Sequence, residues 1–185
     1  TPVAGWTLTG GRSYDSYDKT VGGDTPIGLD ILRTAVTPWA FYKTNNKGWR
    51  YKGKVSWKAA DNVLVYGQVA TGYRPGGVNQ VLGLAQALSY APDKLTTYEG
   101  GIKTSFGGDA LILNLGGYIT DWSDMQVSIN SGSLVYLGNA GAARIKGVEA
   151  EPPPYPTRGL TVIIPAAFTD AKLTAAQSPH AAPTP

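Results

Sequence analysis

Apolar and polar residues alternate along most of this chain with a period of two. The clearest case runs over residues 48–58. Its apolar positions are Trp49, Tyr51, Gly53, Val55 and Trp57, and its polar positions are Arg50, Lys52, Lys54, Ser56 and Lys58. Because a strand points successive side chains to opposite faces, this segment is predicted to be a strand with one apolar and one strongly basic face.

The same pattern, bounded by turn residues, recurs through the chain and predicts further strands. The predicted strands are residues 6–17, 48–58, 63–73, 95–106, 110–122, 125–130, 133–137, 142–151 and 160–173. Short connections at 59–62 and 107–109 contrast with long ones at 18–46 and 75–93, and residues 81–88 could add one or two turns of helix. The predicted fold class is all-β, an antiparallel meander of about eight to ten strands with short turns at one end and long loops at the other.

Composition narrows the functional classes. The chain has 24 Gly, 11 Tyr and 5 Trp but only 16% charged residues, where an ordinary globular domain has about 25%. The net charge of +3 is dispersed, which argues against nucleic acid as a partner. Cysteine is absent and the only histidine is His180, which argues against thiolate metal sites, most histidine metal sites and Ser/His/Asp catalysis. We therefore expect no enzyme, no metal and no cofactor.

Two pairs of carboxylates remain as candidates for acid–base chemistry. Asp121 and Asp124 flank Trp122, and Glu149 and Glu151 lie two residues apart on one predicted strand. Solvated positions in turns and in a barrel lumen account for both pairs more simply.

Tyrosine and tryptophan residues lie mostly near the predicted strand ends. Their rings are apolar and their tips are polar, so they favour a membrane–water interface. The candidate interface aromatics are Trp6, Trp49, Trp57, Tyr66, Tyr98, Tyr118 and Trp122. From this pattern alone, a soluble β-fold packed around its aromatic residues is the alternative.

Five segments, in order and at sensible spacing, resemble motifs of TonB-dependent outer-membrane receptors. They are residues 66–79 (Y-x-x-x-x-x-G-Y-R-P-G-G-x-N), 90–104 (Y-x-P-D-x-x-x-x-Y-E-x-G-x-K), 118–126 (Y-x-x-D-W-x-D-x-Q), 139–149 (N-A-G-x-A-x-x-x-G-V-E), and G-L-T at 159–161 with F-T-D-A-K at 168–172. Together with the flanking strands they cover roughly residues 6–173. Each motif is weak by itself, but the ordered set is specific.

The resemblance implies a siderophore-receptor-like transporter of the bacterial cell outer membrane. Such receptors are transmembrane β-barrels of about 22 strands, filled by an N-terminal plug and energised by the TonB complex. The implied function is active uptake of a ferric siderophore or similar nutrient, with ligand contacts in the long loops and upper lumen. The candidate ligand-binding residues are Tyr73, Arg74, Asn79 and Gln80, and the competing role for them is to shape the loop entrance. The implied partners are outer-membrane lipid, the ligand, and the TonB complex through the plug alone.

The chain also departs from that family. Residues 1–173 supply only about eight to ten of the roughly 22 strands and no plug, so we expect part of the C-terminal half of a barrel. Residues 151–156 (E-P-P-P-Y-P) stand where a strand end and turn are expected, and Pro165 interrupts the last predicted strand. Residues 174–185 are predicted to be a disordered Ala/Pro-rich tail.

Two other functions stay open at this level. A small self-contained barrel of about eight strands would be a structural or adhesive outer-membrane protein, and its first and last strands must pair. A soluble carbohydrate-binding β-protein would use Trp and Tyr as platforms and must bury its apolar faces. The sequence identifies neither the ligand nor the oligomeric state.

Overall fold

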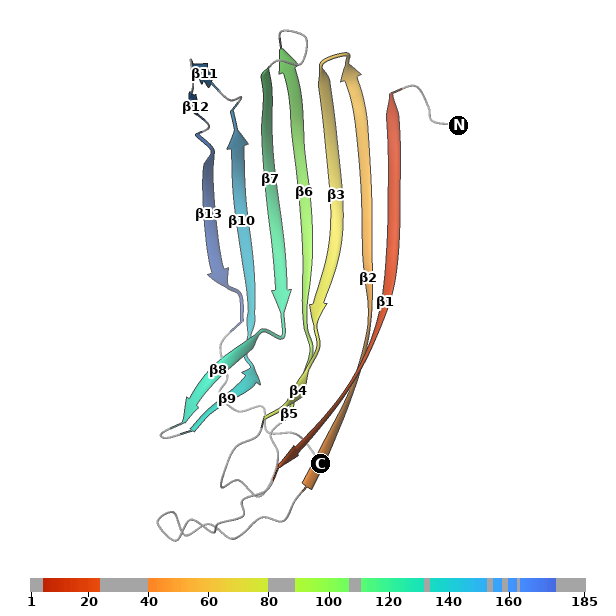
Figure 1. Ribbon diagram of the computed structural model, residues 1–185, viewed down its shortest axis with the longest axis vertical. Helices are drawn as coiled ribbons and strands as arrows, with labels where there is room; N and C mark the ends of the chain where they lie inside the picture. Colours follow the sequence, from red (N-terminus) through yellow and green to blue (C-terminus); the bar gives the residue numbers. More distant parts are fainter. Residues whose placement is uncertain are drawn as a thin grey trace.

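Seven long strands form one antiparallel sheet in the order β1-β2-β3-β6-β7-β10-β13 (Figure 1). The computed structural model describes residues 5–23, 40–79, 89–106, 111–131, 134–152, 155–157, 160–162 and 164–175. The strands of the large sheet are β1 (Trp6–Gly23), β2 (Ala40–Ala60), β3 (Val63–Arg74), β6 (Asp93–Phe106), β7 (Leu111–Ser123), β10 (Ala142–Glu151) and β13 (Ala166–Leu173). The predicted all-β antiparallel meander is confirmed.

Three two-stranded hairpins lie between the long strands. They are β4 (Gly77–Val78) with β5 (Ser89–Tyr90), β8 (Gln126–Ser131) with β9 (Leu134–Asn139), and β11 (Tyr155–Thr157) with β12 (Leu160–Val162). The β4–β5 and β8–β9 hairpins project from one end of the sheet, which we call the long-loop end (Figure 1). The tight Asp61–Asn62 turn between β2 and β3 lies at the opposite, short-turn end. In the described part of the chain, no helix is long and apolar enough to cross a membrane.

The two faces of the sheet differ in character because the strands alternate and pair in register. Leu8 pairs with Val55, and Val69 pairs with Tyr98, which places these side chains on one side, the outer face. Side chains of this face remain exposed, up to 82% for Leu8. Among the described residues, the buried hydrophobic side chains are only Ala140 and Ala143. The sheet therefore has no water-excluding core of its own, which argues against the soluble β-protein.

Aromatic residues of the outer face cluster at two levels. Trp6 stacks on Trp57 with ring centroids 5.6 Å apart, and Tyr14 contacts Trp49 at 4.9 Å. Trp49 and Trp57 are eight residues apart on β2, and a strand rises about 3.3 Å per residue, so the two levels lie about 26 Å apart along the strand. That separation matches the apolar band of about 25 Å that crosses an outer membrane between two aromatic girdles.

Tyrosines of the opposite, inner face lie flat over glycines of the neighbouring strand. Tyr66 pairs with Gly101 and Tyr118 pairs with Gly147. A Cβ atom on Gly101 would lie 2.8 Å from the Tyr66 ring, and one on Gly147 would lie 2.5 Å from the Tyr118 ring. Glycine at these two positions thus lets a large ring cover the backbone without filling the space above the inner face.

Two predicted boundaries are wrong. The long connection predicted at 18–46 is shorter, because β1 continues to Gly23 and β2 begins at Ala40. The polar residues of this segment were the reason for predicting a loop. In the structure they pair across an extended hairpin, and Asn45 donates a hydrogen bond to Asp18. The single strand predicted at 160–173 is divided into β12 and β13. Pro165 lies in the gap, where it has no N–H to donate to a ladder.

Other predictions fall outside the described residues. These are the helical turns at 81–88, the tight turn at 107–109 and most of the tail at 174–185. The small closed barrel is not supported, because β1 and β13 lie at opposite edges of an open sheet.

Candidate functional site

The long-loop end contains a buried carboxylate that gathers three strands. Asp93, at the start of β6, has a fully buried side chain. Its Oδ2 accepts hydrogen bonds from Arg74 Nη2 at 2.5 Å, Trp122 Nε1 at 3.2 Å and the Gln126 backbone N–H at 3.3 Å. The Arg74 guanidinium also lies 5.9 Å from the Trp122 ring centroid. We call these four residues the Asp93 knot.

Three asparagines hold the loop segments to the sheet in a common way. Each side-chain amide donates to and accepts from the backbone of one distant residue. These amide clamps are Asn46 with Gly76 (3.2 and 3.2 Å), Asn79 with Leu137 (2.6 and 2.8 Å) and Asn139 with Ala91 (2.9 and 2.6 Å). Backbone groups outside a ladder need such partners, so the clamps fix where the hairpins leave the strands.

The Gln126 side chain completes this arrangement. Its Nε2 donates to the carbonyls of Pro75 and Ala91, each at 3.0 Å. Asn139 Nδ2 also donates to the carbonyl of Asp124 at 2.7 Å, and Asp124 has a positive φ of 54°. That left-handed turn, which is uncommon for a residue with a Cβ, is therefore stabilised by a contact from across the β8–β9 hairpin.

Four of the five sequence motifs converge on this end. Arg74 comes from the first, Asp93 from the second, Trp122 and Gln126 from the third, and Asn139 from the fourth. Sequence reasoning selected Arg74 and Trp122 but missed Asp93 and Gln126. The only sequence feature that pointed to Asp93 and Gln126 was their position in the motifs. A single sequence does not show that these residues contact Arg74 and Trp122.

The candidate ligand-binding residues lie in or beside these contacts. Arg74 and Asn79 belong to the knot and to a clamp, as described above. Tyr73 lies over Gly48, and its hydroxyl donates to the Asp15 carbonyl at 3.5 Å. Gln80 lies outside the described residues. The structure thus brings three of the four candidates to one end of the sheet, and their contact with a ligand stays a prediction.

The candidate interface aromatics divide between the two faces. Strand register places Trp6, Trp49, Trp57 and Tyr98 on the outer face. It places Tyr66, Tyr118 and Trp122 on the inner face, which corrects their prediction as interface residues. Their position near strand ends suggested the interface, but alternation along each strand decides the face.

The inner face carries a polar network around Glu99. Its carboxylate accepts from Tyr66 Oη at 2.7 Å and from Gln68 Nε2 at 2.6 Å. Lys54 and Lys103 lie over the Tyr66 ring, at 5.1 and 5.9 Å from its centroid. The charged groups of this network are therefore held by neutral hydrogen-bond donors or by an aromatic ring, on a face that is polar as expected for the lumen of a barrel.

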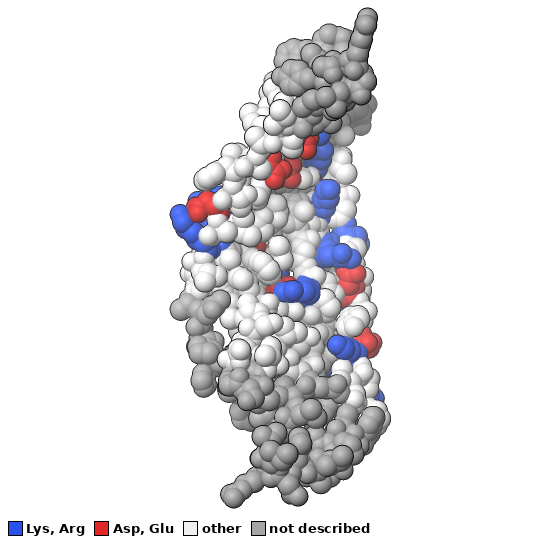
Figure 2. Space-filling view, turned by 60° about the vertical axis from the view of Figure 1, so that its left-hand side comes forward, with Lys and Arg blue, Asp and Glu red and all other residues white. Residues whose placement is uncertain are grey.

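The carboxylate pairs are not arranged for acid–base chemistry. Asp121 forms an ion pair with Arg144 at 2.5 Å, whereas Asp124 lies in the turn before β8. Glu151 accepts from Asn114 Nδ2 at 3.0 Å on the inner face. Figure 2 shows the wider pattern, with red and blue groups side by side on a mostly uncharged surface. Within the described residues, no group of three His, Cys, Asp or Glu side chains could hold a metal ion.

Comparison with known proteins agrees with this geometry. Residues 1–174 match the family described as "TonB dependent receptor-like, beta-barrel". The fold is similar to that of the ferric yersiniabactin uptake receptor FyuA from Yersinia pestis, with a TM-score of 0.75 and 21% identity over 93% of this chain. It is also similar to that of the siderophore receptor PiuA from Acinetobacter baumannii, with a TM-score of 0.70 and 18% identity over 96% of this chain.

The chain spans 25% of the length of each of these two receptors. The likeness therefore concerns one arc of a larger barrel wall together with its loop bases. With two levels of aromatic residues on an exposed apolar face, the chain belongs to the TonB-dependent receptor-like β-barrel family, whose members are non-enzymatic transporters of the bacterial outer membrane.

Proposed function

We propose that this chain forms part of the wall and the loop bases of a receptor that imports a ferric siderophore or a similarly scarce nutrient. The Asp93 knot is the observation that carries the proposal, because it holds two hairpins in fixed positions at the long-loop end of the sheet. A receptor that recognises a small ligand needs loops held in this way on a rigid scaffold. The siderophore is suggested by the printed functions of the two similar receptors.

Within this function, two kinds of residue have separate roles. Arg74 and Asn79 position the loop bases, since their polar atoms already bond to Asp93 and Leu137. Ligand contact then falls on Tyr73, on Gln80 and on the edge of the Arg74 guanidinium, whose side chain is 52% exposed. Energy for transport comes from the TonB complex, which acts through the plug of a complete receptor.

Uptake by cells tests the ligand class. The full-length protein that carries this segment is expressed in a bacterium deprived of its own siderophore receptors. Growth under iron limitation is measured with ferric hydroxamate, catecholate and phenolate chelates supplied singly. We expect one class to restore growth and to require an intact TonB complex. If none of the chelates restores growth and the protein binds another scarce nutrient instead, the siderophore is rejected as the ligand, whereas the role as an uptake receptor is retained.

A further inference from the structure

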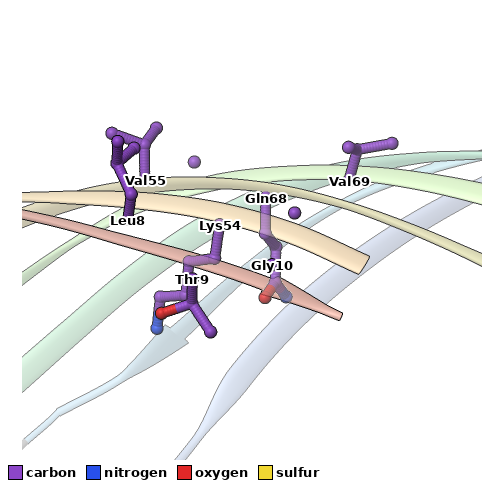
Figure 3. A pocket seen from close by; sticks show the side chains of 9 residues that line it. Leu8, Thr9, Gly10, Lys54, Val55, Gln68 and Val69 are labelled. Atoms are coloured by element: carbon purple, nitrogen blue, oxygen red, sulfur yellow. The ribbon is translucent and has the colours of Figure 1, made fainter. Parts of the chain in front are cut away.

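The outer face has a hollow between β1, β2 and β3. Its volume is about 540 Å³. The side chains of Leu8, Val55 and Val69 stand on the same side as this hollow, whereas those of Thr9, Lys54 and Gln68 point to the other side of the sheet (Figure 3). The walls of the hollow are therefore apolar, although a basic strand passes beneath it.

Glycines form the floor of the hollow. They are Gly10, Gly53 and Gly67. A Cβ on Gly10 would meet nothing within 4 Å, and those on Gly53 and Gly67 would meet their nearest atoms only at 3.7 and 3.8 Å. The fold does not require glycine here for close packing, as it does at Gly101. The hollow is thus space that this part of the chain leaves open to its surroundings.

The position of the hollow identifies those surroundings. On β2, Gly53 lies midway between Trp49 and Trp57, the aromatic residues of the two interface levels. Hydrocarbon fills the space outside an outer-membrane barrel between its two girdles. An apolar trough at that depth has a lining that suits an acyl chain of a lipid.

A cation lies beside the hollow at the interface level. Arg12 is two residues beyond Gly10 on the same face and pairs with Tyr51. Its guanidinium is 5.6 Å from the Trp49 ring centroid, and no described carboxylate forms an ion pair with it. Arginine binds phosphate oxygens well because of its planar array of N–H donors. The headgroup that fits at this level is therefore anionic.

We propose that Arg12 and the Gly10–Gly53–Gly67 hollow form a binding site for one phosphorylated lipid of the outer leaflet. The phosphate bonds to Arg12, and an acyl chain lies over the three glycines. Arg12 lies on the long-loop side of the hollow, and long loops of such barrels face the exterior. The proposal commits to lipid A, the phosphorylated glycolipid of that leaflet, rather than to a second copy of the chain.

Binding of radiolabelled lipid A to the full-length protein in detergent tests this site. We expect Arg12→Gln to weaken binding about tenfold, as for the loss of one charge-assisted contact, and Arg12→Lys to restore part of it. Gly10→Leu fills the trough and should weaken binding about fivefold. Dephosphorylated lipid A should bind to the unaltered protein as weakly as lipid A binds to Arg12→Gln.

Gly11→Leu is the matched control. Gly11 is the next residue on β1, points to the other face, and also has open space around its Cβ. Its lipid affinity should equal that of the unaltered protein. Heat-modifiable mobility in gels checks that each variant is folded. The proposal is rejected if Arg12→Gln and Gly10→Leu bind lipid A normally, if Gly11→Leu loses as much affinity as Gly10→Leu, or if cross-links across Gly53 join two copies of the protein.

Discussion

The strand bodies and the long-loop end of this molecule differ in where their side chains find partners. On the strands, an outer-face residue such as Leu8 is 82% exposed and has its environment supplied by lipid. At the long-loop end, the Asp93 side chain is fully buried and has its hydrogen bonds supplied by residues 19 to 33 positions away. Outer-face positions such as Leu8 therefore depend mainly on the polarity of the side chain, whereas the knot depends on particular atoms.

The knot should be the more fragile region. Replacing Asp93 by Ala removes the carboxylate that accepts from Arg74, Trp122 and the Gln126 backbone N–H, although Arg74 keeps its bond to the Gln126 carbonyl. Because the Arg74 side chain is 52% exposed and water can solvate it, the cost is that of losing hydrogen bonds to a buried carboxylate, about 2–3 kcal/mol. We expect urea unfolding in lipid vesicles to show this loss, with the β8–β9 hairpin newly open to protease. Unchanged protease resistance would mean that the hairpins do not depend on Asp93.

A charge on the outer face probes the wall. Val55→Arg should lower the free energy of unfolding by about 2 kcal/mol, because it places a cation in the apolar band near mid-membrane. Ser56→Arg, one residue along and on the inner face, should have little effect. Equal losses for the two variants, measured by the same urea titration, would contradict the assignment of faces.

Glycine substitutions compare close contact with open space inside the wall. Gly101→Ala places its Cβ 2.7 Å from the Leu115 carbonyl and 2.8 Å from the Tyr66 ring, and overpacking of this kind costs about 1–2 kcal/mol. The adjacent Gly100→Ala has 3.7 Å of clearance and should be nearly neutral. Thermal unfolding of both variants measures the difference.

The clamp at Asn79 separates positioning from ligand contact. Asn79→Ala loses two hydrogen bonds to Leu137 and should cost about 1 kcal/mol. If Asn79 only positions the loop, ligand affinity and protease resistance near β9 fall together. A fall in affinity with normal protease resistance would assign Asn79 to the ligand instead. Equilibrium binding and limited proteolysis on the same sample decide between the two roles.

The smallest effect belongs to the short-turn end. Lys58 and Asp61 form an ion pair of 3.4 Å between exposed side chains. Such pairs contribute very little to the free energy of unfolding because water and salt screen them. Asp61→Ala should therefore leave the unfolding curve almost unchanged, and a clear loss would show that this turn matters more to the wall than its exposure suggests.

The sequence predicted the wall well because one local rule decides it. Alternation over residues 48–58 is visible without knowledge of any neighbour, and the structure pairs Trp57 with Trp6 and Trp49 with Tyr14 as that rule requires. The same rule failed for the distal part of β1 and β2. There polar residues such as Asp18 and Asn45 occur on both faces of the hairpin, so the alternation of apolar and polar residues vanishes although the strands continue.

The knot could not be predicted in the same way. Asp93 follows a proline and precedes a lysine, which is the sequence of an exposed turn. Its burial comes from Arg74 and Trp122, which belong to other segments and reach it only once β3, β6 and β7 are paired. Resemblance to a family indicated which residues to examine, but the contacts themselves depend on long-range register.

The order of strands also bears on how the wall is built. In the large sheet each strand pairs with the long strand next to it along the chain, from β1 through to β13. Such pairings join segments that are neighbours in the sequence, and the entropy of closing their loops grows only slowly with loop length, which favours formation of the sheet. Each new strand therefore has its template in place when it arrives, and the wall can grow by one strand at a time as the chain is delivered to the membrane.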